Sequence, residues 1–62
     1  MNFENTKEYQ KLTTTEKAVY KNAIDCFLYG YTFQDLNYYD LTEKRAKQIW
    51  KMVFNFLFLE GF

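Results

Sequence analysis

The side chains best suited to binding chemistry lie between residues 42 and 51. This segment holds four cations and one anion, although the whole chain is neutral, with eight basic and eight acidic residues. Ammonium groups can contact phosphates, while guanidinium and amide groups can hydrogen-bond base edges. Arg45 and Gln48 are therefore the candidates for reading base edges. Thr42 and Lys44 would lie near the sugar–phosphate backbone of the DNA. The complete candidate nucleic-acid surface is Thr42, Lys44, Arg45, Lys47, Gln48 and Lys51. The alternative is the solvated face of an amphipathic helix.

A second group of candidates is aromatic. Seven Phe, six Tyr and one Trp stand among only 62 residues, and a domain of this size leaves much of its surface in contact with water. Aromatic residues dominate protein-binding hot spots, and rings beside cations can also stack on unpaired bases. The alternative is that they pack the connection between two helices. The rings in question surround one short segment: Tyr29, Tyr31, Phe33, Tyr38 and Tyr39.

The last nine residues carry a third group, which is suited to an oligomer seam or to docking on a larger protein. Its members are Phe54, Phe56, Phe58, Leu59 and Phe62. Ordinary core packing is the alternative, and helical spacing assigns Phe54 and Leu57 to the core. Insertion into a membrane surface is disfavoured, because the cations lie in the first half of this helix and not along its apolar half.

Catalytic chemistry has little material here. The chain has no histidine, no serine and a single cysteine, Cys26, which lies beside Phe27 and suits an inert core thiol. We expect no catalytic residue, metal site or cofactor. A lone thiol, the absence of signal-peptide features and an apolar stretch too short to span a bilayer predict a cytoplasmic protein without membrane contact.

Capping motifs predict where helices begin in a single domain of residues 1–62. Thr13 and Glu16 form a capping box, followed by an apolar face of Tyr20, Ala23, Ile24, Phe27 and Leu28, and Gly30 suits the helix end. Thr32 and Asp35 predict a short second helix, from about Phe33 to Tyr39, with a hydrophobic staple between Tyr31 and Leu36.

A longer third helix is predicted to begin at Asp40 or Thr42 and to continue to about Leu59, with Gly61 ending it. Residues 1–12 either fray or form one turn capped by Asn5, with Phe3, Tyr9 and Leu12 docking on the core. The expected fold is all-α, a small three- to four-helix bundle of helix-turn-helix type without a wing.

Three parts of the sequence carry a family resemblance. They resemble the helix-turn-helix of LuxR-type and sigma-factor region 4 DNA-binding domains, and they are Leu12-Thr13 with Glu16 and Val19, then Gly30-Tyr31-Thr32-Phe33-Gln34-Asp35-Leu36, and later Leu41-Thr42-Glu43-Lys44-Arg45-Ala46-Lys47. The resemblance spans about residues 12–50. It implies that the third helix is a recognition helix. Asn37 and Asp40 stand where these families have a small residue and a turn glycine.

These observations predict a non-catalytic accessory or regulatory protein. The abundance of Phe, Tyr, Asn, Lys and Ile suggests an AT-rich bacterium, its phages or its mobile genetic elements. The expected partner is a larger DNA-processing enzyme, acting in replication, priming, recombination or transcription, with weak DNA contact and a homodimer left open. One alternative is an autonomous transcriptional regulator. Another is a phage inhibitor of a host enzyme.

Overall fold

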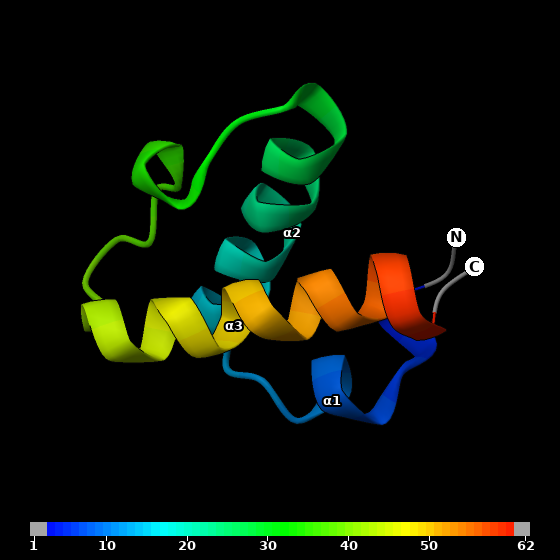
Figure 1. Cartoon of the computed structure of the whole chain (residues 1–62). Coiled ribbons are helices and arrows are strands. Elements are labelled where there is room, and N and C mark those ends of the chain that lie inside the picture. The colour runs from blue at the N-terminus through cyan, green and yellow to red at the C-terminus, as the bar shows by residue number, and fades with distance from the viewer. Residues whose placement is uncertain (1–2, 61–62) are drawn as a thin grey trace.

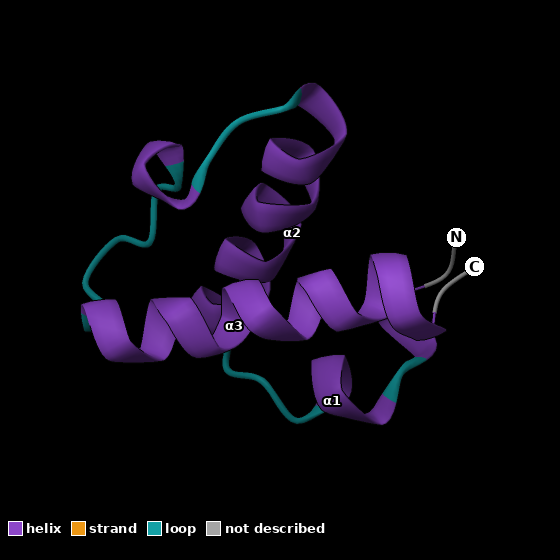
Figure 2. Cartoon of the chain, viewed as in Figure 1, coloured by secondary structure: helices purple, strands orange, loops and turns teal. Residues whose placement is uncertain are grey.

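Two long helices, α2 (Thr14–Tyr29) and α3 (Glu43–Asn55), form the framework of the computed structural model, which describes residues 3–60 (Figure 1). They cross steeply, and α1 (Lys7–Gln10) lies beside the C-terminal half of α3. Three short turns complete the order: η1 (Phe3–Asn5), η2 (Phe33–Asp35) and η3 (Phe56–Glu60). Within residues 3–60 there is no strand, as Figure 2 shows, so the all-α expectation without a wing is confirmed.

The ends of α2 are those that the sequence predicts. The Glu16 amide donates to Thr13 Oγ1 at 3.2 Å, and the Thr13 amide donates to Glu16 Oε1 at 3.0 Å. This reciprocal pair satisfies two amides that the first helical turn leaves without backbone partners. At the other end, Gly30 has a φ of 79° and its amide donates to the carbonyl of Cys26. Glycine adopts this left-handed conformation without the steric cost that a Cβ imposes.

The start of α3 is decided by Thr42 and not by Asp40. The Arg45 amide donates to Thr42 Oγ1 at 3.1 Å, whereas Asp40 lies in the preceding turn. The α-helical pattern ends at Asn55, and η3 continues it as one π-helical turn. The predicted end at Gly61 lies outside the described residues.

The predicted second helix over residues 33–39 is wrong in length, because only the single 3-10 turn η2 forms. Asp35 Oδ2 accepts from the Thr32 amide at 3.0 Å, so the start is capped as expected. Leu36 then turns extended, with φ −74° and ψ 126°, and buries its side chain in the core. The helix therefore stops at this point, and the extended backbone of Leu36 directs its side chain into the core. The left-handed residue in the following turn is Tyr39, at φ 53°, and not Asp40.

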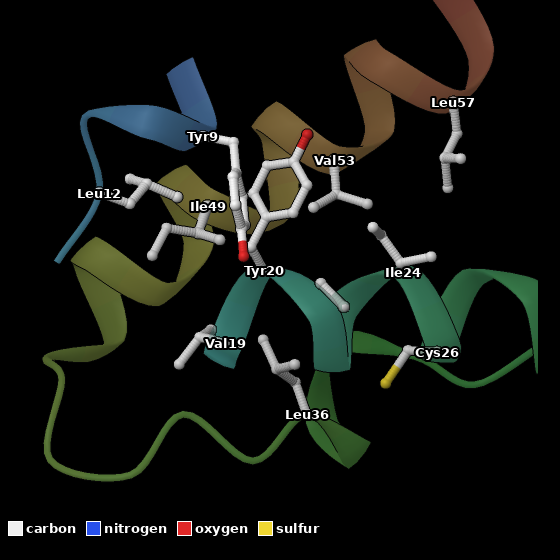
Figure 3. Close-up of a cluster of buried hydrophobic side chains, with 11 residues drawn as sticks. Tyr9, Leu12, Val19, Tyr20, Ile24, Cys26, Leu36, Ile49, Val53 and Leu57 are labelled. Atoms are coloured by element: carbon white, nitrogen blue, oxygen red, sulfur yellow. The ribbon is translucent and has the colours of Figure 1, made fainter. Parts of the chain in front are cut away.

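The core fills the space where α2 crosses α3, and the N-terminal turns close one side of it (Figure 3). Tyr9 and Leu12 are buried, and the Phe3 ring lies 5.2 Å from that of Tyr9, so the predicted docking of this segment is confirmed. The cap of α1 is Thr6, whose Oγ1 accepts from the Tyr9 amide, and not Asn5. The buried hydrophobic residues are Tyr9, Leu12, Val19, Tyr20, Ala23, Ile24, Cys26, Leu36, Ala46, Ile49, Val53 and Leu57.

Candidate interaction surfaces

Arg45 is held by the protein itself. Its Nε donates to Glu16 Oε2 at 2.7 Å, and its Nη1 donates to Gln48 Oε1 at 2.9 Å. The structure therefore brings the two candidate base readers together, and they bind one another. Recognition of a base by Arg45 or Gln48 would first require these hydrogen bonds to be exchanged.

The ion pair sets the protonation of Glu16. The hydrogen bond from Arg45 lowers the pKa of the Glu16 carboxyl below its ordinary value, and the amide of Thr13 lowers it further. The Glu16 side chain is only 14% exposed, against 37% for that of Arg45. Charge-assisted hydrogen bonds in such partly buried positions are stronger than those between exposed groups. Glu16 thus caps α2 and ties it to α3 with the same carboxylate.

The other predicted nucleic-acid-binding residues differ in whether their side chains already have partners within the protein. Thr42 caps α3, and Lys47 pairs with Glu43 at 2.9 Å while its Nζ lies 5.6 Å from the centroid of the Phe33 ring. Lys44 and Lys51 are exposed, and neither lies in an ion pair with an acid of the described part of the chain. Two lysines are thus the free cations of this face, and DNA contact by α3 stays a prediction.

An aromatic ridge joins α2 to α3 and η3. We define it as Phe27, Trp50, Phe54 and Phe58. The Phe27 ring is the hub, with centroids 4.3 Å from Trp50, 6.0 Å from Phe54 and 5.8 Å from Phe58. Phe54 and Phe58 also contact one another at 5.0 Å. Phe27 and Trp50 are half-buried, whereas Phe54 is 43% exposed and Phe58 is 58% exposed. The inner side of the ridge therefore packs against the protein, and its outer side is exposed to solvent.

The predicted interface residues divide into two groups. Tyr29, Tyr31, Tyr39 and Phe58 are exposed, with Tyr29 at 73%. Tyr38 and Phe56 are half-buried against the core, and the Tyr38 ring stacks on Phe33 with centroids 5.8 Å apart. Phe62 lies outside the described residues. Tyr38 and Phe56 therefore have packing roles, whereas the other four rings keep large solvent-exposed surfaces.

One assignment to the core needs correction, and one member of an expected apolar face is exposed. Leu28 continues the apolar spacing of α2 but is 58% exposed. Phe54 was expected in the core by its spacing, yet a large part of its ring is exposed. A usable signal for the ridge was present, since Trp50, Phe54 and Phe58 recur every four residues and so follow one side of a helix.

The remaining sites favour no chemistry of their own. One hollow of about 320 Å³ is lined by Thr6, Glu8, Tyr20, Met52, Asn55 and Phe56, a small volume for a ligand pocket. Burial raises the pKa of the Cys26 thiol, with contributions from Asp35 and Asp25, so the thiolate that a nucleophile needs is disfavoured. The described part of the chain holds no cluster of acidic, cysteine or histidine side chains able to bind a metal. No helix within residues 3–60 is long and apolar enough to cross a membrane.

Comparisons with protein families, with curated proteins and with solved structures find nothing that matches this chain.

Proposed function

We propose that this chain is a non-catalytic accessory protein that docks onto a larger protein through the aromatic ridge. The observation that supports the proposal is the pair Phe54 and Phe58. Their rings contact one another, yet both remain substantially exposed. Contiguous exposed apolar groups mark interaction surfaces more often than isolated ones do.

The anchoring of the ridge favours binding over incidental exposure. Half-buried Phe27 contacts both exposed rings, and Trp50 packs against Phe27. A pre-positioned ring loses little conformational entropy when a partner covers it, so more of its burial contributes to affinity. Exposed Leu59 adds apolar surface in the same helical turn as Phe58. Phe and Trp, the residue types of the ridge, are enriched at protein–protein interfaces relative to the rest of the surface.

For the partner, we propose a DNA-processing enzyme of a phage or mobile element. The support is the composition, rich in Phe, Tyr, Asn, Lys and Ile, which is typical of AT-rich phages and mobile elements, together with the resemblance of residues 12–50 to helix-turn-helix domains. Docking is favoured over autonomous base reading by the internal hydrogen bonds of Arg45 and Gln48. The autonomous regulator and the phage inhibitor stay as alternatives.

The test compares folding with complex formation in cells that naturally produce the chain. Single variants Phe54→Ala and Phe58→Ala should lower the thermal midpoint much less than truncation of a fully buried residue does, because both rings are partly exposed. They should reduce the recovered complex by more than about tenfold, as truncation of a hot-spot residue does. The control is Leu57→Ala, which lies on the buried side and should lower the midpoint sharply. Unchanged recovery with both phenylalanine variants would reject the ridge as the docking surface.

A further inference from the structure

A basic strip continues the aromatic ridge toward the start of α3. Residues Lys47, Lys51, Phe54 and Phe58 follow one another at intervals of four, three and four, which places them on one side of a helix. From Lys47 to Phe58 this side extends over about 16 Å. The helix thus presents cations along its first half and exposed rings along its second half.

The charge of the strip is incompletely balanced. Lys47 is paired with Glu43 at 2.9 Å, but Lys51 and the adjacent Lys44 are exposed and lie in no ion pair with a described acid. The segment from Glu43 to Lys51 has four cations and one anion. A partner that covers this side must therefore supply negative charge over the lysines and apolar side chains over the rings.

We propose that the occupant is an acidic amphipathic helix of the partner protein, lying along α3 with carboxylates over Lys44 and Lys51 and apolar anchors over Phe54 and Phe58. This inference rests on the proposed docking function and specifies its ligand. An α-helix suits the site because its own residues recur on the same spacing as the strip, so about three turns match the length of the surface. Charge complementarity at one end sets the direction in which the helix lies.

A nucleic acid fits the same surface less well. Phosphates would satisfy the two lysines, but Leu59 and the outer edges of the two phenyl rings would gain most from apolar side chains. The neutral net charge of the chain also gives a polyanion little long-range attraction. The surface therefore favours a peptide that is acidic at one end and apolar at the other.

The experiment measures fluorescence anisotropy with three labelled probes. The first is an amphipathic helical peptide of about five turns, with Glu on the polar positions of one half and Leu and Phe anchors in the other. The second has Lys in place of each Glu, and the third is single-stranded oligothymidylate. We expect the acidic peptide to bind at least about tenfold more tightly than the lysine peptide or the oligonucleotide. The double variant Lys44→Glu/Lys51→Glu should reverse this preference between the two peptides.

The outcomes separate this inference from the proposed function. Equal binding of both peptides, lost on Phe54→Asp/Phe58→Asp substitution, would retain the docking ridge and overturn the acidic partner. Tighter binding of oligothymidylate would overturn the helical peptide in favour of a nucleic acid. Absence of binding by either peptide, in a protein whose circular dichroism shows the native fold, would also overturn the inference. The complex-recovery assay with Phe54→Ala and Phe58→Ala decides the proposed function independently.

Discussion

Arg45 on α3 donates through Nε to Glu16 Oε2 on α2 at 2.7 Å, although 29 positions separate the two residues in sequence. Glu16 also closes the capping box of α2 through its other carboxylate oxygen, Oε1, which accepts from the Thr13 amide. One side chain therefore fixes where α2 begins and how its start lies against α3. This arrangement holds the helix that carries the basic strip and most of the aromatic ridge.

Substitutions at Glu16 should separate these two roles. Glu16→Ala removes both the cap and the ion pair, and we expect a loss of about 2 kcal/mol in the free energy of unfolding. Glu16→Gln retains an acceptor that a capping box accommodates, so it should lose about 1 kcal/mol. Urea unfolding followed by circular dichroism measures both, with exposed Glu8→Gln as the control. Equal losses for the two Glu16 variants would contradict a separate capping role.

The same carboxylate should make stability depend on pH. Because Arg45 and Thr13 lower the pKa of Glu16 in the folded chain, the deprotonated form is favoured by folding. Its contribution is complete above the ordinary glutamate pKa of about 4.3 and is lost as the pH falls through the lower folded value. The difference in unfolding free energy between wild type and Glu16→Gln should therefore shrink as the medium is acidified below about pH 4. A constant difference across this range would remove the electrostatic explanation.

Tyr39 should prove to be strained. Its φ of 53° is costly for a residue with a bulky side chain. The compensation is small, because its hydroxyl accepts from Asn22 Nδ2 at 3.3 Å in an exposed position. We expect Tyr39→Asn to raise the free energy of unfolding by about 0.5–1 kcal/mol. The matched control Tyr38→Asn should lower it, since Tyr38 is half-buried and stacks on Phe33; a loss in both variants would refute the strain argument.

The sequence predicted the features that depend on neighbours along the chain. The capping box at Thr13 and Glu16, the left-handed Gly30 and the cap at Thr42 are all confirmed, because each involves residues within four positions of one another. The length of the second helix could not be read locally. A cap at Thr32 begins a turn, but the burial of Leu36 against the distant core decides that the turn stops.

The candidate surfaces were predictable only as sets of residue types. Helical spacing placed Arg45 and Gln48 on an accessible face of the third helix. It could not indicate that the Arg45 guanidinium would pair with Glu16. Exposure of Phe54 likewise depends on where α2 ends relative to α3, since the hub Phe27 contacts that ring from one side. Local patterns identify caps and faces, while the partner of a long side chain depends on the crossing of the helices.

Any DNA affinity of the isolated chain should come from Lys44 and Lys51. We expect weak binding that falls steeply with salt, and Lys44→Gln/Lys51→Gln should reduce the slope of log K against log salt by about 2 for duplex DNA. Substituting Arg45 by Glu is a poor test, because it would place two carboxylates together at Glu16. An unchanged salt slope in the double glutamine variant would show that these lysines do not contact phosphates.

Photo-crosslinking in intact cells tests the docking ridge most directly. A photoreactive phenylalanine analogue at position 58 should produce a covalent adduct with one partner protein, since this ring is exposed on the outer side of the ridge. The same analogue at Gln10, which is exposed on α1, should produce no such adduct. Adding Phe54→Asp should abolish the adduct at position 58 while circular dichroism shows the native fold. An adduct that forms equally from positions 10 and 58, or that persists beside Phe54→Asp, would contradict docking through the ridge.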